Sequence, residues 1–510
     1  MQSKTLWLSG VLSVLPGIAF AQTFGDTIDG WFAWSTGWFV RFIFSAFPGT
    51  DIPWIVGWLV IAAVVFTVYF GFIQFRAFGH AIALVMGRYS DPRHLGEVSH
   101  FQALTAALSG TVGLGNIAGV AVAVSIGGAG ATFWMIVAGL LGMASKFTEC
   151  TLGVKYRNEY PDGTVSGGPM YYLCKGFAER GLPFGRPLAA LFAVFCVLGA
   201  LGGGNMFQAN QAASQINAVF AVPTWVTGLA LSVVVFAVIV GGIRSIARVT
   251  EKVVPLMGVG YVLVSLVILL ANADMILWAF REILRGAFTD TGIVGGIVGA
   301  VIQGFRRAAF SNEAGVGSAA IAHSAVRTKE PITEGFVSLL EPFVYTVVIC
   351  TMTALVIIIT QQLLIDPETG RYIITEAGRI ATASGATGGV PITSAAFGSA
   401  FTWAPVALSV AVILFAFSTI ITWDYYGVKA WTYLLGEGQR KELAFKIIFC
   451  VFVFIGAVSG LDALIDFSDA AIFAMALVNV LALYLLMPVV KRELQSYLAR
   501  LKSGEIRPAR

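Results

Sequence analysis

Two long apolar stretches of this sequence are interrupted by glycines and small polar residues, and such interruptions expose backbone groups that can bind ions. The first interruption reads SGTVGLGN at residues 109–116, and the second reads FSNEAGVGS at residues 310–318. Each contains a Gly-x-Gly run next to a polar residue. An unwound backbone presents free amides, which hold an anionic group, and free carbonyls, which coordinate a cation. The two interruptions therefore predict a site that binds an anionic group together with a cation.

The elements that must position these interruptions are membrane-spanning helices. Of the 510 residues, 57% are hydrophobic and 12% are charged, which is more apolar surface than a soluble core of this size can bury. Apolar runs of about 20 residues recur, and each can cross a hydrocarbon layer of roughly 30 Å as a helix. The spans expected from these runs are 52–75, 100–127, 130–154, 188–220, 222–243, 253–273, 293–323, 332–360, 393–428, 443–460 and 470–490. Two further segments, 168–181 and 275–290, are too short or too charged and are expected as surface helices.

The N-terminal residues are typical of a secretory signal peptide at 1–21. Lys4 precedes a short apolar run at 6–18, and an Ala-Phe-Ala cleavage motif follows at 19–21. Cleavage would leave the mature N-terminus outside the cell; an uncleaved first helix is the alternative. Residues 22–99 are then expected to form an interfacial helix, one extra transmembrane helix and a cytoplasmic linker. The interfacial helix would be anchored by Trp31, Trp34 and Trp38 on one face.

Basic residues are concentrated in the loops on one predicted side of the membrane, which fixes the orientation by the positive-inside rule. The loops of that side contain Arg76, Arg88, Arg93, Lys155, Arg157, Lys175, Arg180, Arg186, Arg244, Arg248, Lys252, Arg327, Lys329, Lys429, Arg440, Lys441 and Lys446. The opposite side contains Arg41, Arg281, Arg285, Arg371 and Arg379. We therefore expect a periplasmic mature N-terminus, a cytoplasmic tail at 491–510 and a location in the bacterial plasma membrane, as in the inner membrane of a Gram-negative cell.

The two interruptions occupy matching places in the predicted topology. Each opens a set of five spans, at 100–273 and 293–490, and an odd number of spans gives the two sets opposite orientations. That is the inverted-repeat plan of many secondary transporters. The alternative is that the glycines only permit close helix packing, but glycine at membrane depth is costly unless protein or a water-filled cavity satisfies the freed backbone groups.

Four segments carry a resemblance to a known family. They are SGTVGLGNIAGVA at 109–121, GGGNMFQANQAA at 202–213, GFRRAAFSNEAGVGSAAIA at 304–322 and FAFSTIITWDYYG at 415–427. With these motifs the sequence resembles the alanine/glycine:cation symporters of the amino acid–polyamine–organocation superfamily. The resemblance implies an all-α integral membrane protein with the LeuT-type five-plus-five fold, one extra N-terminal span and about eleven spans in total. It implies a secondary active symporter that imports alanine and glycine with sodium by alternating access; protons or another small amino acid are the alternative.

The resemblance also implies roles for individual residues. Backbone amides of Leu114 and Gly115 would hold the substrate carboxylate, and Thr419 and Trp423, four apart on one helical face, would orient and cover a small side chain. The implied substrate-binding residues are Thr111, Gly113, Leu114, Gly115, Asn116, Gln208, Gln211, Phe310, Ser311, Asn312, Thr419 and Trp423. A sodium site is implied at Ser109, Val112, Phe415, Ser418 and Thr419. Asn205 adds to the polar face of Gln208 and Gln211, where interhelical hydrogen bonding is the alternative role.

Ionisable residues in or beside the spans leave proton coupling open, because charge at membrane depth is expensive and usually functional. They are Glu149, Glu313, Glu341 and Asp424. Structural ion pairs, Lys146 with Glu149 and Arg306 with Glu313 or Glu341, are the competing explanation. The sequence departs from the family's commoner residues at Ala129, Tyr345, Thr422, Asp424 and Val428, which bears on substrate preference and on the coupling cation.

Other classes of function are not favoured. No HExxH, P-loop or GxSxG motif occurs in a suitable context, so an enzyme is not expected, and neither is a cofactor beyond the transported sodium. The expected partners are the amino acid, sodium or a proton, and the lipid bilayer, without nucleic acid. The histidines His80, His94, His100 and His323 fall outside metal-ligand spacing, and Cys150, Cys174, Cys196, Cys350 and Cys450 are expected to pack as apolar residues.

Overall fold

The computed structural model describes residues 30, 34–50, 52–91, 93–111, 113–161, 163–289, 296–360, 362–366, 372–375, 379–386 and 388–508. The predicted signal peptide at 1–21, Trp31 and Val112 lie outside the described residues. Within them the chain is a helical bundle, and regular strands are confined to a short antiparallel hairpin of β1 (Asn158–Glu159) and β2 (Val165–Ser166).

The helices differ widely in length, from single turns to long rods. Those that precede the second interruption are α3 (Trp54–Tyr69), α4 (Ile73–Arg76), α5 (Phe78–Val85), α6 (His100–Thr111), α7 (Ala118–Gly127), α8 (Gly130–Lys155), α9 (Pro169–Glu179), α10 (Gly185–Leu201), α11 (Phe207–Phe220), α12 (Thr224–Ile239), α13 (Gly242–Ala271), α14 (Ala273–Phe288) and α15 (Gly296–Asn312). Those that follow it are α16 (Ala319–His323), α17 (Pro331–Ser338), α18 (Leu340–Pro342), α19 (Thr351–Ile359), α20 (Val390–Ala400), α21 (Ala404–Leu435), α22 (Gln439–Val458) and α23 (Leu461–Lys502).

The long helices have the composition of membrane spans. Among the described residues, six helices are long and apolar enough to cross a membrane, and the bent pair of α6 and α7 makes seven. Helices α3 and α12 are shorter apolar helices of 16 residues each. The chain is therefore an all-helical, multi-span membrane protein. The segments 168–181 and 275–290, which were too short or too charged to be predicted as spans, form α9 and α14.

One predicted span is wrong in its boundaries. The apolar run at 393–428 is divided between α20 and α21, which are separate helices. The backbone is extended at Phe401 (φ −144°, ψ 132°), and α21 then starts with a proline in its first turn. Proline is favourable there because it fixes a helical φ and lacks an amide that would have no partner. Hydrophobicity alone did not separate the two helices.

Both glycine interruptions break their helices as predicted. The helix axis turns by 61° between α6 and α7, where a 3₁₀ turn, η1 (Leu114–Asn116), intervenes. The second break separates α15 from α16, and in it Gly315 (φ 83°) and Gly317 (φ 93°) have left-handed backbones. Glycine adopts that region without steric penalty, so it permits the sharp turn. Two π-helical segments, η2 (Gly202–Met206) and η3 (Phe343–Cys350), interrupt further helices and were not predicted.

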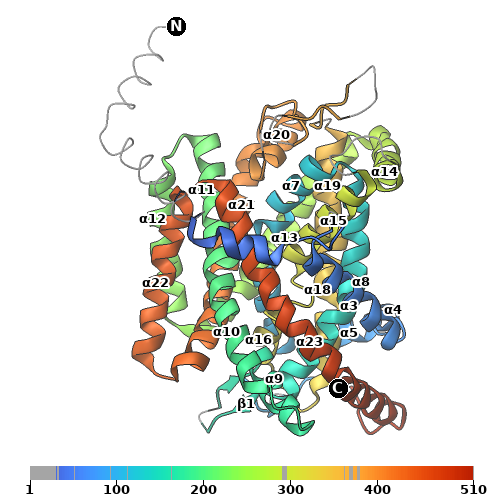
Figure 1. Ribbon diagram of the computed structural model, residues 1–510, viewed down its shortest axis with the longest axis vertical. Coiled ribbons are helices and arrows are strands. Elements are labelled where there is room, and N and C mark those ends of the chain that lie inside the picture. Colours follow the sequence, from blue (N-terminus) through green and yellow to red (C-terminus); the bar gives the residue numbers. More distant parts are fainter. Residues whose placement is uncertain are drawn as a thin grey trace.

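The helices form two groups that meet at α21. Helix α8 packs against α15 and α17, and α7 packs against α15, whereas α10 and α11 pack against α21, and α12 packs against α22. Helix α6 contacts α21. Figure 1 shows the second group on the left of the molecule and the first group on the right, with α20 and α14 at one end and α9 and the β1 hairpin at the other. The first break therefore lies where the two groups come together.

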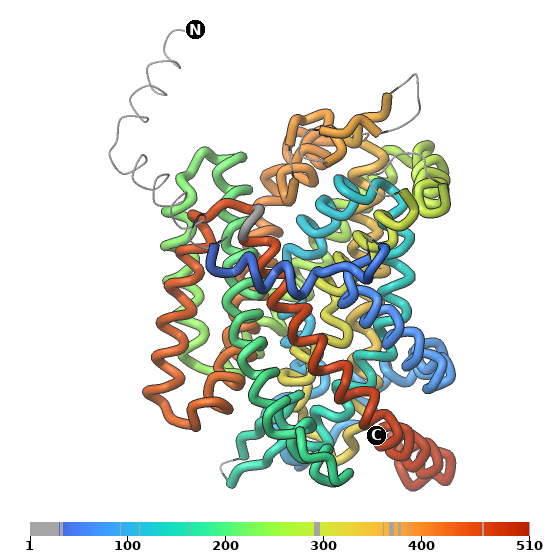
Figure 2. The backbone as a smooth tube through the Cα atoms, in the orientation of Figure 1, coloured from blue at the N-terminus to red at the C-terminus, as the bar shows by residue number. Residues whose placement is uncertain are grey.

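Residues 34–43 form a helix that lies across the long helices, as the dark blue segment of Figure 2 shows. Phe39 stacks near Phe195 of α10, with ring centroids 6.1 Å apart, and Phe44 contacts Phe473 of α23. Trp34 and Trp38 remain 80% and 65% exposed. This exposed aromatic face agrees with the anchoring role predicted for the tryptophans.

Candidate functional site

The end of α6 at the first break is held by side chains of α21. The hydroxyl of Thr419 donates a hydrogen bond to the carbonyl oxygen of Ser109 at 2.9 Å. The indole nitrogen Nε1 of Trp423 donates to the carbonyl oxygen of Gly110 at 3.1 Å. Carbonyls at the end of a helix lack partners within the helix, and here side chains of α21 donate the missing hydrogen bonds. The two α21 residues share one helical face, as their spacing predicted.

The residues predicted to bind the cation come together at this contact. Ser109 Oγ donates to the carbonyl oxygen of Ser418 at 2.5 Å, and Ser418 Oγ donates to the carbonyl oxygen of Phe415 at 3.1 Å. Thr422 Oγ1 donates to Ser109 Oγ at 3.1 Å. Ser109, Ser418 and Thr419 are all buried. The result is a dry cluster of neutral hydroxyl and carbonyl oxygens, and these are ligands that hard cations accept.

The amide predicted to hold the substrate carboxylate is occupied by a side chain. Leu114 N donates to Gln208 Oε1 at 2.8 Å, and Gln208 Nε2 donates to the carbonyl oxygen of Gly203 at 2.9 Å. A Cβ atom on Gly113 would lie 2.7 Å from Gln208 Oε1. Glycine at this position therefore permits the close approach. The amide oxygen of Gln208 lies where a carboxylate oxygen would accept the same hydrogen bond.

Asn116 links the two breaks. Its Nδ2 donates to the carbonyl oxygen of Thr111 at 3.3 Å, while its Oδ1 accepts a hydrogen bond from Ser311 Oγ of α15. Asn312 is used within the second break, because its Oδ1 accepts from Ala314 N at 2.9 Å and its Nδ2 donates to Thr346 Oγ1 at 3.1 Å. The predicted residues of the two breaks thus form one hydrogen-bonded unit.

A cavity of about 10 Å³ lies inside this unit. Its lining consists of Gly110, Thr111, Gly113, Gly115, Gly203, Gln208, Phe310, Glu313, Trp423 and Ile472. A volume of this size is about that of one water molecule. The site is therefore closed in this conformation, and an amino acid can enter only if the surrounding helices separate.

Two residues of the polar face predicted at Asn205, Gln208 and Gln211 make their contacts outside the closed cavity. Gln211 Oε1 accepts from Val390 N at 3.0 Å and so holds the first turn of α20. Asn205 Nδ2 donates to the carbonyl oxygen of Phe449 in α22 at 2.7 Å. Neither lines the closed cavity. Interhelical hydrogen bonding, the alternative role considered for these residues, describes both.

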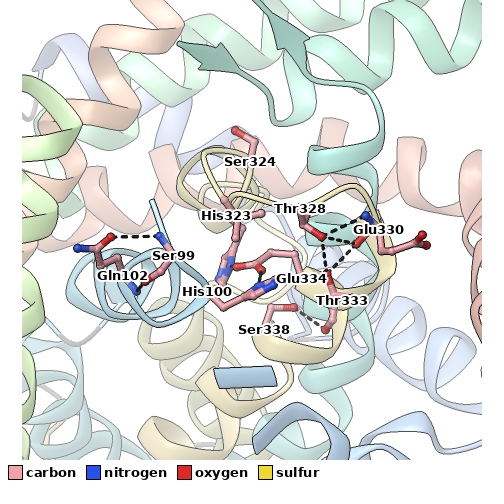
Figure 3. A network of polar contacts seen from close by, with 12 residues as sticks. Ser99, His100, Gln102, His323, Ser324, Thr328, Glu330, Thr333, Glu334 and Ser338 are labelled. Carbon is pink, nitrogen blue, oxygen red and sulfur yellow. Dashed lines mark hydrogen bonds and ion pairs between the residues drawn. The ribbon is translucent and has the colours of Figure 1, made fainter. Parts of the chain in front are cut away.

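A buried acid–base chain, which was not predicted from the sequence, includes the first residue of α6 and the last residue of α16. We use this name for His100, Glu334, His323, Glu341, Lys146 and Glu149, and Figure 3 shows its first part around Glu334. His100 Nδ1 lies 2.5 Å from Glu334 Oε2. Lys146 Nζ lies 3.1 Å from Glu341 Oε2 and 3.8 Å from Glu149 Oε1. The predicted pairing of Lys146 with Glu149 is confirmed.

His323 lies between two carboxylates of this chain. Its Nδ1 is 2.6 Å from Glu334 Oε1, and its Nε2 contacts Glu341 Oε1. A neutral imidazole has one N–H donor and one acceptor nitrogen, whereas an ionised carboxylate only accepts. Both contacts can be hydrogen bonds only if this group of three side chains carries one more proton than neutral histidine with two carboxylates. The geometry therefore requires a buried proton at His323 or on one of its neighbours.

The predicted partners of Arg306 are wrong. Arg306 Nε donates to Asp469 Oδ2 at 2.9 Å, and its NH2 group lies 3.3 Å from Asp466 Oδ1. Arg307 also contacts Asp469. The aspartates belong to α23, whereas Glu313 lies in the second break, directly after the last residue of α15. Among the described residues, no group of histidine, cysteine and acidic side chains is arranged to hold a metal ion.

Comparisons with known proteins agree with this architecture. The model of the sodium:alanine symporter family matches residues 39–509. The sodium/alanine symporter AgcS of Methanococcus maripaludis is 38% identical over 447 residues, which cover 87% of this chain and 94% of that protein. A putative sodium/proton-dependent alanine carrier protein of Bacillus subtilis, YrbD, is 32% identical, and the match covers 82% of this chain and 88% of that protein.

A solved structure extends the comparison to the fold. The crystal structure of MhsT in complex with L-phenylalanine superimposes with a TM-score of 0.51 at 14% sequence identity, covering 79% of this chain and 99% of that one. The expected LeuT-type fold is thereby confirmed. The chain is a cation-coupled amino acid symporter and not an enzyme, and it belongs to the sodium:alanine symporter family.

Proposed function

We propose that this chain imports alanine and glycine into a bacterial cell, driven by an inward sodium gradient. The observation that carries the proposal is the cluster in which α21 meets the broken end of α6. There, hydroxyls of Ser418 and Thr419 face carbonyls of Phe415 and Ser109 without an ionised group among them. Sodium can be held by several neutral oxygens, whereas a coupled proton needs a group that titrates.

The size of the substrate follows from how Trp423 is held. A Cβ atom on Gly204 would lie 2.1 Å from Trp423 Cγ, so the indole is packed directly onto the π-helical turn. Its nitrogen is fixed by the carbonyl oxygen of Gly110. A ring held at two sides leaves little space above the amides of the first break. An amino acid with a hydrogen atom or a methyl group as its side chain fits such a space best.

We propose that the amino acid makes the contacts that the sequence predicted. Its carboxylate displaces Gln208 Oε1 and takes the hydrogen bond of Leu114 N, while its ammonium group faces the carbonyls near Phe310 and Ser311 at the second break. Because the cavity holds about one water molecule, binding must accompany a separation of the two helix groups. Residues 100–273 and 293–490 would be the inverted repeats, and each of them contributes helices to both groups.

Proton coupling is the second candidate, and the His323 geometry favours it. A proton shared by His323, Glu334 and Glu341 lies inside the membrane-spanning part of the chain. If that proton is exchanged in each transport cycle, transport would follow the proton gradient rather than the sodium gradient. The relatives include a sodium/alanine symporter and a carrier named sodium/proton-dependent.

Uptake into proteoliposomes tests both candidates. Labelled alanine is supplied outside under four conditions, in which a sodium gradient and a proton gradient are each present or absent. The proposal predicts accumulation whenever sodium is higher outside, with or without a pH difference. Accumulation that follows only the pH difference would support the second candidate. Uptake that ignores both gradients would contradict coupled transport.

A further inference from the structure

A second, much larger cavity lies at the end of the molecule that carries the basic loops. Its volume is about 650 Å³. It lies between α21, α22, the turn before α13 and the residues of the β1–β2 hairpin. In Figure 1 the hairpin and α9 mark this end, opposite to α20. The cavity is distinct from the closed one of about 10 Å³ at the glycine breaks.

Two buried side chains of opposite charge face into this cavity. Asp424 of α21 is 1% exposed, and Lys446 of α22 is 7% exposed. Asp424 Oδ1 has no hydrogen-bond partner. Among the described residues, neither side chain forms a direct ion pair, and both line the same cavity. A buried charge without a partner is strongly unfavourable, and a ligand that supplied both partners would relieve both charges.

The other ionic side chains around the cavity are either engaged or at its rim. Glu97 accepts a hydrogen bond from Val165 N at 3.1 Å, and Lys429 donates to Ser166 Oγ at 2.7 Å. Arg244 and Glu437 are exposed to solvent. Glu442, one turn before Lys446 on α22, is partly exposed. Asp424 and Lys446 are therefore the two buried ionic side chains, not paired with each other, that a ligand in the cavity would meet.

We propose that this cavity is a second binding site for a zwitterionic amino acid, whose ammonium group pairs with Asp424 and whose carboxylate pairs with Lys446. A small cation satisfies only the first side chain, and an inorganic anion only the second. The cavity is also of the size usual for small-molecule sites. The inference rests on the proposed function for the identity of the ligand.

The position of Asp424 connects the two sites. Asp424 directly follows Trp423, whose indole lines the closed cavity, so one turn of α21 borders both spaces. Val428 and Thr432, at four-residue intervals from Asp424, continue the lining of the larger cavity. If the solute leaves the glycine breaks past Trp423, it reaches the space between Asp424 and Lys446. The second site would then bind the solute after it has left the glycine breaks.

Equilibrium binding of radiolabelled alanine to the purified full-length protein in sodium buffer tests the proposal. Wild-type protein should bind about two molecules per chain, in a tight and a weak component. Asp424→Asn and Lys446→Gln should each remove the weak component and keep the tight one, which also reports that the variants are folded. Glu437→Gln, the same kind of change at the exposed rim, should keep both components.

Competitors identify the chemistry of the weak component. Unlabelled glycine should displace it at concentrations at which ethylamine and propionate, which each carry one of the two charges, do not. Displacement by ethylamine alone would mean a cation site, and displacement by propionate alone an anion site; either would overturn the proposal. A wild-type protein with one component, or variants that keep two, would overturn it while leaving gradient-driven uptake intact. Failure of uptake itself would instead contradict the proposed function.

Discussion

The glycine breaks and the buried acid–base chain both include residues of the broken helices, with His100 on α6 and His323 on α16, yet they satisfy buried polar groups in opposite ways. At the first break, neutral hydroxyls, amides and carbonyls satisfy one another, as in the contact of Thr419 with Ser109. In the chain, basic and acidic side chains alternate, from His100 through Glu334, His323 and Glu341 to Lys146.

The difference indicates that the two regions have different roles in the transport cycle. Neutral contacts can be exchanged for a ligand at low cost, because each hydrogen bond contributes only about 1 kcal/mol net. A buried ion pair is costly to break, by about 3–5 kcal/mol when one partner is removed. The breaks are therefore the part that can open, and the acid–base chain is the part that stays together. Four predictions test this comparison.

The largest effect is expected from breaking the acid–base chain at its centre. Glu341→Gln removes the charge of the carboxylate that contacts both Lys146 and His323 in a fully buried place, and leaves Lys146 only its longer contact with Glu149. We expect a loss of about 3–5 kcal/mol in the free energy of unfolding, measured by denaturant or thermal unfolding in detergent. Glu493→Gln is the matched control, because its pair with Lys155 at 2.6 Å is partly exposed and should be worth less than about 1 kcal/mol. Equal losses in both variants would contradict the assigned roles.

The next effect concerns the break itself. Gly113→Ala places a methyl group 2.7 Å from Gln208 Oε1, the far end of a flexible side chain, so the protein should fold but lose the hydrogen bond to Leu114 N. Disturbing one buried hydrogen bond costs about 1–3 kcal/mol, which we expect as a loss in the free energy of unfolding of the closed conformation, measured by denaturant unfolding in detergent.

Gly260→Ala is the control for this change. Gly260 lies within α13, and a Cβ atom there would have nothing within 4 Å. Because alanine favours a helix more than glycine does, stability should be kept or rise and uptake should be unchanged. If Gly113→Ala behaves in the same way, the closed site does not depend on the approach of Gln208.

The two regions also differ in how far the sequence predicted them. The breaks were found because glycines at membrane depth have a local signature, and Thr419 and Trp423 were placed together by their spacing of four on one helix. The acid–base chain has no local signature. His100 and Glu334 are 234 residues apart, and their contact depends on the packing of α6 against α17.

The errors have different origins. The partners of Arg306 were sought on nearby segments of the sequence, but Asp466 and Asp469 come from α23, more than 150 residues away. The division of the predicted span 393–428 has a local signal, Pro405 in the first turn of α21, which hydrophobicity does not include. Hydrophobicity also gives no sign of the π-helical turns η2 and η3. Gln211 was placed in the site because it belongs to the same polar face as Gln208. Its side chain instead accepts a hydrogen bond from Val390 N of α20.

A smaller effect is expected at the cation cluster. Thr419→Ala removes the hydroxyl that donates to the carbonyl of Ser109. Loss of one neutral ligand oxygen should cost about 1 kcal/mol, which is roughly a fivefold rise in the sodium concentration for half-maximal uptake. Val451→Ala on α22, where the side chain is 52% exposed, is the control and should not change it. The same shift in both variants would exclude Thr419 from the cation site.

The smallest effect is expected at the end of the acid–base chain. His100 is its terminal member and contacts the chain through Nδ1 alone, 2.5 Å from Glu334 Oε2. In His100→Gln an amide N–H can donate to the same oxygen, and Glu334 keeps its contact with His323 at 2.6 Å. No charge is left without a partner, so the free energy of unfolding should fall by less than about 1 kcal/mol. Unfolding curves measured beside those of Glu341→Gln provide the test. A loss as large as that of Glu341→Gln would mean that the chain depends equally on every member, and that its strength is not concentrated at the doubly contacted residues His323 and Glu341.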